Sequence, residues 1–183
     1  MSLRLWLACK ARPTTERVAR AFQASGTRSF QAAKPCRNII IVMTRAELLT
    51  FMRGHSLAVQ ASVSAVDAPQ AAVVGFAVTD DFEIVFDTLE TTRKVVNLRR
   101  NAQCALVIGG LLDGDERTVQ YEGIADEPSG QELQGLKEVY FARFPDGRDR
   151  QKWAGLTYVR VRPKWIRYSD FNQAPPVIVE VTF

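Results

Sequence analysis

Hydrophobic and polar positions alternate along much of residues 43–183, and the spacing predicts a chain rich in β-strands. In residues 56–63 apolar side chains occupy every second position, a period of two that indicates a strand. Similar segments follow at 71–78, 83–86, 104–108, 118–125, 157–162, 165–168 and 177–181, separated by turns rich in Pro, Gly and Asp. The pattern therefore predicts seven or eight short strands.

Helical spacing occurs in three places. Thr44 and Glu47 form a Thr-x-x-Glu capping box that opens a helix running through Met52. Two further helices are predicted near residues 92–100 and 129–144. Because closing a sheet removes its exposed edges, the expected fold is a mainly β architecture, a β-barrel with α-helical excursions.

Charge divides the chain into two regions. Residues 1–42 carry eight basic residues and one acidic residue, whereas residues 43–183 carry 16 basic and 19 acidic residues. We interpret residues 1–42 as a basic N-terminal extension, disordered or not part of the native protein, and residues 43–183 as the domain. A transit peptide, a leader added for expression and an upstream start are the competing explanations. The capping box at Thr44, where a domain can begin, favours the upstream start.

Several function classes lose support from composition. The domain is mildly acidic, so a nucleic-acid partner is not expected, and no apolar run approaches the length of a membrane span. Cys9, Cys36 and Cys104 form no C-x-x-C pair, which argues against zinc and disulfides and favours the cytoplasm. We expect no metal site, and the lone His55 is given no catalytic role.

The segment with the clearest chemical signal is the start of the helix at residues 92–100. Thr91 or Thr92 is the expected N-cap, which places Arg93 and Lys94 in the first turn. Cations are unfavourable there because unpaired amides make the N-terminus of a helix positive. A bound phosphate would compensate, with Arg and Lys as its partners. The alternative, two solvated surface side chains, has equal weight from this helix alone.

Three segments together resemble a known family. Residues 85–98 (VFDTLETTRKVVNL) look like the FMN-phosphate segment of the pyridoxamine 5′-phosphate oxidase-like split-barrel family. Residues 118–126 (TVQYEGIAD) are similar to the strand that follows in that family, and residues 140–145 (YFARFP) resemble its Tyr-Phe-x-x-Arg-Pro helix end. The order and spacing of the three agree, so the resemblance covers essentially residues 43–183.

The resemblance implies an FMN-binding split barrel that pairs as a homodimer with the cofactor at the interface. It implies that Thr88, Thr92, Arg93 and Lys94 hold the phosphate. The backbone of Val73 and Val74, on the second strand, is implied to run along the flavin ring. Trp153 could supply an aromatic wall there, with a packed core or a dimer contact as its alternative. The implied cofactor-binding residues are Val73, Val74, Asp87, Thr88, Thr92, Arg93, Lys94, Thr118 and Trp153.

Departures from the family shape the functional hypothesis. The family's true oxidase has Arg where this chain has Ala72, an Arg where it has Phe144, and an aromatic residue where it has Ser169. These differences argue against pyridoxamine-phosphate oxidation. The sequence therefore predicts an FMN-dependent oxidoreductase acting on an unidentified small molecule, with no catalytic side chain assigned. The alternative is a module that binds a deazaflavin, haem or a tetrapyrrole on the same barrel without FMN turnover.

Overall fold

The computed structural model describes residues 43–110 and 112–183, and the interpretation of residues 1–42 lies outside that part of the chain. The helices are α1 (Arg45–Arg53), α2 (Arg93–Arg100), α3 (Gly130–Arg143) and α4 (Gly147–Arg150). The strands are β1 (Leu57–Val63), β2 (Pro69–Gly75), β3 (Ala77–Val78), β4 (Ile84–Leu89), β5 (Gln103–Gly109), β6 (Arg117–Asp126), β7 (Leu156–Asp170) and β8 (Val177–Thr182). The predicted mainly β architecture is confirmed.

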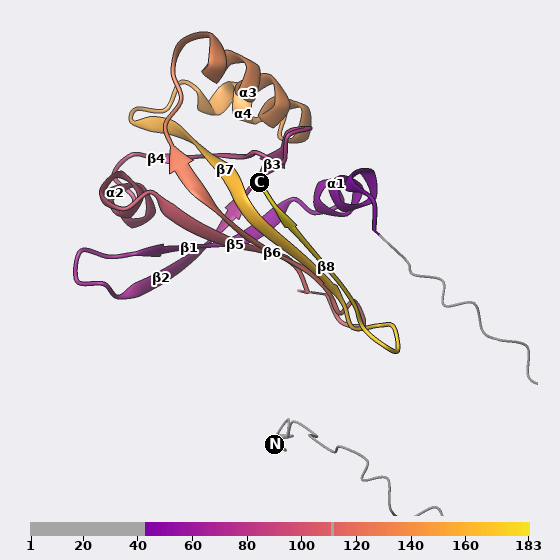
Figure 1. Ribbon diagram of the computed structural model, residues 1–183. Coiled ribbons are helices and arrows are strands. Elements are labelled where there is room, and N and C mark those ends of the chain that lie inside the picture. Colours follow the sequence, from indigo (N-terminus) through magenta and orange to yellow (C-terminus); the bar gives the residue numbers. More distant parts are fainter. Residues whose placement is uncertain (1–42, 111) are drawn as a thin grey trace, which may run out of the picture. The chain divides into compact units, whose positions relative to one another are not determined.

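The strands form one antiparallel sheet that curls until its two ends meet (Figure 1). Its order is β2-β1-β5-β6-β7-β4-β3, with β8 added beside β7. The first and last strands of this order, β2 and β3, are separated in the chain only by Phe76. One continuous stretch of backbone therefore pairs with β1 through its first half and with β4 through its second half. The single strand predicted at residues 71–78 is in fact these two strands.

Strand β7 holds the two halves of the sheet together. It pairs with β4 through residues 156–161, with β6 through residues 160–170 and with β8 through residues 165–170. A bulge opposite Glu122 and Gly123 separates the two segments, and Pro163, which cannot donate to a ladder, lies where the partner changes. The separate strands predicted at 157–162 and 165–168 were wrong, because the bulge interrupts the pairing register but not the strand.

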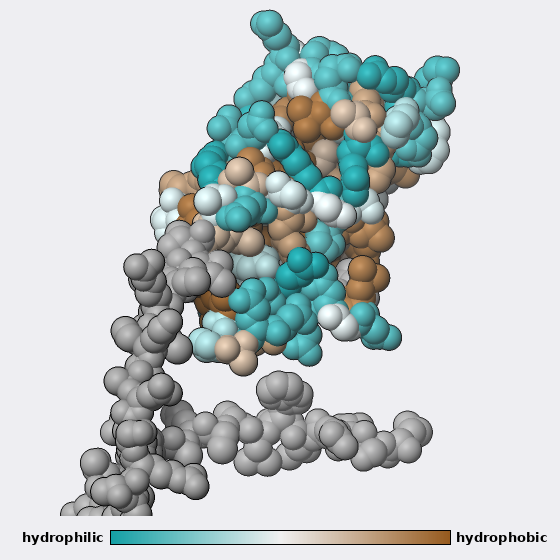
Figure 2. All heavy atoms as spheres, turned by 90° about the vertical axis from the view of Figure 1, so that its right-hand side faces the viewer, coloured by the Kyte–Doolittle hydropathy of each residue, from teal (hydrophilic) through white to brown (hydrophobic). Residues whose placement is uncertain are grey.

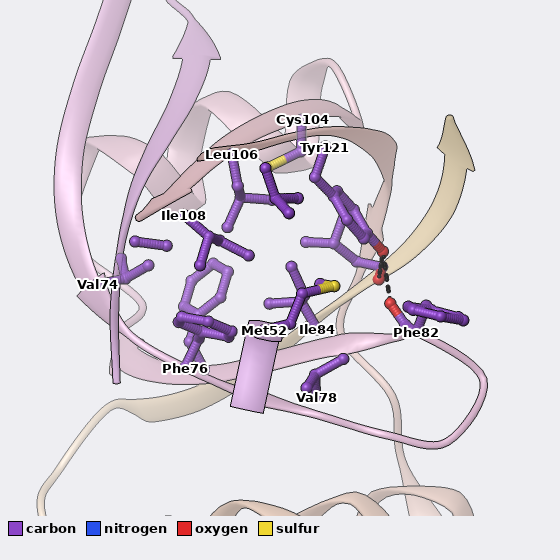
Figure 3. Packing of buried hydrophobic residues seen from close by; sticks show 14 of the residues in the cluster. Met52, Val74, Phe76, Val78, Phe82, Ile84, Cys104, Leu106, Ile108 and Tyr121 are labelled. Atoms are coloured by element: carbon purple, nitrogen blue, oxygen red, sulfur yellow. Dashed lines mark hydrogen bonds between the residues drawn. The ribbon is translucent and has the colours of Figure 1, made fainter. Parts of the chain in front are cut away.

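The barrel interior is filled by the main hydrophobic cluster (Figure 3). Met52 of α1 is fully buried among side chains of β2, β3, β4 and β5, so α1 closes one end of the barrel. The hydroxyl of Tyr121 lies 2.7 Å from the carbonyl oxygen of Val161 and 3.0 Å from that of Phe82. A buried phenol is thus paired inside an apolar core, as buried polar groups require.

A second, smaller cluster lies between the sheet and α3. Leu136, Tyr140 and Phe141 of α3 pack on Val85 and Tyr158 of the sheet. Arg160, buried in β7, anchors the same helix by pairing with Glu132 of α3, and it also pairs with Asp126 of β6 at 2.6 Å. The turn predicted after α3 contains the additional short helix α4.

Strand β1 turns polar side chains toward the barrel interior and apolar side chains outward, the opposite of an ordinary amphipathic strand. Its buried residues are Ala58, Gln60 and Ser62, whereas the alternate positions, from Leu57 to Val63, are half-buried or exposed. Val59 faces outward with Val73 and Val107 beside it on β2 and β5, and these two are 61% and 41% exposed. The outer surface of β1, β2 and β5 is therefore apolar, and the interior beneath it is partly polar.

Candidate functional site

Helix α2 begins without a side-chain cap. Thr92 is its N-cap residue, but the Thr92 hydroxyl donates to the carbonyl oxygen of Leu89 at 2.8 Å and caps no helix amide. Val96 is the residue whose amide makes the first helical bond, to Thr92 O, and the first turn contains no acidic residue. The amides that precede Val96 consequently point out of the helix start, together with Arg93 and Lys94.

Polar side chains from the sheet fix this helix start in place. Gln70 Oε1 of β2 accepts from Arg93 Nε at 3.1 Å and from Asn97 Nδ2 at 3.0 Å. Asn97, which is buried, also donates to Ser62 Oγ of β1 at 3.1 Å. The Arg93 guanidinium is thus oriented through Nε, and its two terminal nitrogens have no hydrogen-bond partner among the described residues.

A cavity of about 660 Å³ lies in front of the helix start. Its walls come from the inward-facing side of β1, the first half of β2 and the β4–α2 connection. The lining residues are Gln60, Ser62, Pro69, Gln70, Ala71, Ala72, Thr91, Thr92, Arg93 and Lys94. Thr88 adjoins this set, because its hydroxyl oxygen lies 3.3 Å from that of Thr92. The cavity is therefore rich in donors at one end.

The charge of the cavity is positive. No Asp or Glu is among the lining residues. Partial burial lowers the pKa of Lys94, and the nearby charge of Asp87 opposes that effect by raising it. A cation that loses solvation in this way is stabilised by an anionic ligand, because the ligand replaces the lost water.

Asp87 itself is held on the other side of β4. Its carboxylate accepts from Tyr140 Oη at 2.7 Å and from Arg150 Nε at 2.8 Å. Successive residues of a strand point to opposite faces, so Asp87 faces α3 and α4 while Thr88 faces the cavity side. The charge of Asp87 raises the pKa of Lys94 and so acts on the site. The bonds of Asp87 to Tyr140 and Arg150 hold strand β4 in position.

Gln60 leaves an unpaired acceptor at the cavity. Its side chain is fully buried, and its amide nitrogen donates to Ala61 O at 2.8 Å. Its Oε1 has no hydrogen-bond partner among residues 43–110 and 112–183. A buried acceptor without a donor is costly, and this one lies beneath the surface of the cavity wall.

The residues expected to bind the cofactor do not all meet. Thr88, Thr92, Arg93 and Lys94 come together at the cavity. Val73 and Val74 follow directly on the lining residue Ala72 of β2, with Val73 exposed and Val74 buried. Thr118, on β6 beside Gly109, and Trp153, 57% exposed between α4 and β7, do not line the cavity.

Sequence reasoning missed the polar wall formed by Gln60, Ser62, Gln70 and Asn97. A signal existed for Asn97, which lies four residues after Arg93 and so on the same face of α2. No such signal exists for the others, because their inward orientation depends on which face of β1 and β2 the barrel encloses.

Metal-binding clusters and membrane-spanning helices are both absent from the described residues. No group of three or more His, Cys, Asp or Glu residues there could hold a metal ion. Within the same residues, no helix combines the length and the apolar character needed to cross a membrane.

The family model described as pyridoxamine 5′-phosphate oxidase matches residues 44–170. A search of curated proteins found no match.

Solved structures share the fold at low sequence identity. A haem-binding protein from Mycobacterium smegmatis has a TM-score of 0.66 at 14% identity, over 78% of this chain but only 60% of its own length. General Stress Protein 26 from Bacillus anthracis has a TM-score of 0.57 at 20% identity, over 75% of this chain and 98% of its own. The haem storage protein HutZ from Vibrio cholerae has a TM-score of 0.57 at 14% identity, over 65% and 89%.

Proposed function

Because its residues 44–170 match the family model, the chain belongs to the pyridoxamine 5′-phosphate oxidase family, and we propose that it is an FMN-binding oxidoreductase. The observation that carries the proposal is the uncapped start of α2, with Arg93 and Lys94 beside a positive cavity of about 660 Å³. An FMN phosphate fits this arrangement in charge and in the number of donors.

The proposed phosphate contacts come from three sources. The amides of the first turn of α2 donate to the phosphate oxygens, as at other helix N-termini. The terminal nitrogens of Arg93 add a directed pair of hydrogen bonds, because Gln70 holds the guanidinium through Nε. Lys94 contributes a point charge, and the hydroxyls of Thr88 and Thr92 are the remaining partners.

The rest of the cavity suits the body of the nucleotide. The polar residues Gln60 and Ser62 of β1 line this part of the cavity. The backbone of Val73 and Val74 continues the cavity wall along β2 and is the proposed edge for the ring. When bound, FMN supplies the redox chemistry, and the chain anchors and orients it.

The oxidation of pyridoxamine 5′-phosphate itself is not part of the proposal. Ala72 contributes no charge to the cavity wall, and Phe144 occupies the helix end where the family's oxidase has Arg. The Phe144 ring lies against Gly75, where an added β-carbon would be 3.1 Å from Phe144 Cζ. An apolar ring thus stands at the position that the resemblance assigns to a phosphate-binding arginine.

Dimer formation is the second part of the proposal. The outer surface of β1, β2 and β5 exposes Leu57, Val73 and Val107, which a second copy of the chain would cover. Thr118 and Trp153 do not line the cavity of their own subunit, so any contact they make with the cofactor would come from the second copy.

FMN titration tests the function directly. We expect quenching of FMN fluorescence on binding, and a loss of affinity of about 100-fold in the double variant Arg93→Ala, Lys94→Ala, since two charge-assisted contacts are removed. Arg99→Gln is the matched control, because Arg99 lies at the other end of α2 and pairs with Glu127 at 2.6 Å. Equal affinity of wild type and the double variant would contradict the proposal. Consumption of reduced nicotinamide with FMN and an electron acceptor then tests turnover.

Haem binding is a second candidate, favoured by the orientation of His55. Its Nδ1 lies 2.9 Å from the carbonyl oxygen of Phe51. A carbonyl only accepts, so Nδ1 carries a proton and Nε2 of the neutral ring keeps its lone pair for a metal. A Soret band on adding haemin, lost in His55→Ala and kept in the Arg93, Lys94 double variant, would favour haem over FMN.

A further inference from the structure

A second cavity, of about 390 Å³, lies between α1, β3 and α3. It is lined by Met52, Arg53, His55, Phe76, Ala77, Val78, Val139, Ala142 and Arg143. Figure 2 views the α1 side of the molecule and shows hydrophobic surface set among hydrophilic side chains. We refer to this cavity as the α1–α3 pocket. It shares no lining residue with the cavity at the start of α2.

The walls of the α1–α3 pocket are apolar for a structural reason. Phe76 and Val78 belong to the main hydrophobic cluster, and Met52 of α1 packs with them. On the opposite wall, Val139, Ala142 and Arg143 lie three and four residues apart and so share one face of α3. Helices α1 and α3 each cover part of β3, and the pocket is the space left between them. Its volume lies in the range of small-molecule sites.

The charged groups of the pocket are all basic. Arg53 is already engaged, because its terminal nitrogen lies 2.6 Å from Asp80 Oδ1. Arg143 has no hydrogen bond or ion pair within the described part of the chain, and no Asp or Glu is among the lining residues. Arg143 is exposed and lines the pocket, so its guanidinium is available for a bidentate contact with an anion.

We propose that the α1–α3 pocket binds a small organic carboxylate with an apolar body, whose carboxylate pairs with Arg143. The body lies over the buried side chains of Phe76 and Val78 and against Val139 and Ala142 of α3. Removal from water of its own apolar surface and of the apolar surface on α3 supplies the hydrophobic part of the affinity. An inorganic anion fits less well, because it would leave the apolar walls uncovered. A cation is disfavoured by Arg53 and Arg143 together.

Binding of 1-naphthoate, followed by its fluorescence, tests the proposal with the full chain. We expect saturable binding to the wild type and a loss of about 10-fold or more in Arg143→Gln, which removes a charge-assisted pair. The neutral isostere 1-naphthalenemethanol should bind wild type and Arg143→Gln alike. The control variant Arg162→Gln removes a half-exposed arginine of β7 outside the pocket and should leave naphthoate binding unchanged.

A second variant tests the location. Ala142 is exposed on α3, so Ala142→Trp should fold normally while its side chain fills the pocket and abolishes binding of naphthoate. Full binding to Ala142→Trp, equal affinity in Arg143→Gln, or no saturable binding to the wild type would each overturn the proposal. The titration is repeated with the Arg93, Lys94 double variant, which should bind naphthoate normally. Failure of the FMN proposal and failure of this one are therefore distinguishable.

Discussion

Tyr140 donates its hydroxyl proton to Asp87 Oδ1 over 2.7 Å, and this bond joins helix α3 to strand β4. Burial, and then the hydrogen bond to Asp87, raises the pKa of Tyr140 and keeps the phenol protonated. The carboxylate is shared with Arg150, so three side chains from three elements meet at one buried point. The position of Asp87, and through it the environment of Lys94, depends on this contact.

We expect Tyr140→Phe to lower the free energy of unfolding by about 2 kcal/mol, because a hydrogen bond to a buried charged group is lost. Tyr158→Phe is the matched control. The Tyr158 hydroxyl is buried and has no partner among the described residues, so its removal should leave stability unchanged or raise it slightly. Urea unfolding of the three proteins gives the comparison. A larger loss for Tyr158→Phe than for Tyr140→Phe would contradict the assignment.

Two glycines should respond in opposite ways to alanine. At Gly123, beside the bulge of β7, a β-carbon would overlap the carbonyl oxygen of Arg162 and lie 2.8 Å from Val161 Cγ1. We expect Gly123→Ala to destabilise the fold by about 2 kcal/mol or more through overpacking. Gly135, within α3, has no atom within 4 Å of an added β-carbon.

Gly135→Ala should therefore stabilise the protein by about 0.5 to 1 kcal/mol, because alanine loses less backbone entropy in a helix. Thermal unfolding of both variants and the wild type measures these changes in stability. If both substitutions changed the stability in the same direction, the space around each glycine would not determine the effect of alanine.

Stability should fall at alkaline pH because of Cys104. Burial raises the pKa of this thiol from 9.0 to about 11, and a hydrogen bond from Gln60 partly opposes the increase. A group with a raised folded pKa contributes its full stability below the unfolded value and loses it as the pH rises through the folded value.

The stabilising contribution of Cys104 is therefore complete below pH 9 and lost by about pH 11, a change of about 3 kcal/mol. The free energy of unfolding of Cys104→Ala should decline less between these pH values than that of the wild type. Parallel curves for the two proteins would show that the thiol ionises equally in the folded and unfolded states.

The apolar outer surface of β1, β2 and β5 predicts the oligomeric state. We expect the wild type to run as a dimer in size-exclusion chromatography with light scattering, and Val73→Lys or Val107→Lys to shift it toward the monomer. A buried lysine without a partner opposes association. Val66→Lys, at an 83% exposed position between β1 and β2, should remain dimeric. A wild-type monomer would exclude this interface.

The local pattern of hydrophobic, polar and capping residues predicted most of the fold. The capping box at Thr44 and Glu47 is present as predicted, with Glu47 N bonded to Thr44 Oγ1 at 3.2 Å. The strand that contains Pro163 was predicted as two, yet β7 continues through the proline and pairs with β4 before it and with β8 after it. Pairing partners are set by the whole sheet, so the one-dimensional pattern could not reveal this continuity.

Only part of the candidate site could be predicted from the sequence. The misplaced charges of Arg93 and Lys94 depend on a local property, the direction of the helix, and could be predicted. The role of Gln60 could not, because alternation alone assigns Val59 to the interior and Gln60 to the surface, and the barrel encloses the other face. The assignment of FMN to these residues stays a prediction.

Phe76 links strands at opposite ends of the sheet order, and this connection bears on how the molecule reaches its folded state. Joining distant segments ordinarily costs chain entropy that grows with the length of the loop between them. Here the hairpin of β1 with β2 and the pairing of β3 with β4 are already tethered by a single residue. Once both have formed, bringing the two ends of the curled sheet together requires no additional loop to be ordered.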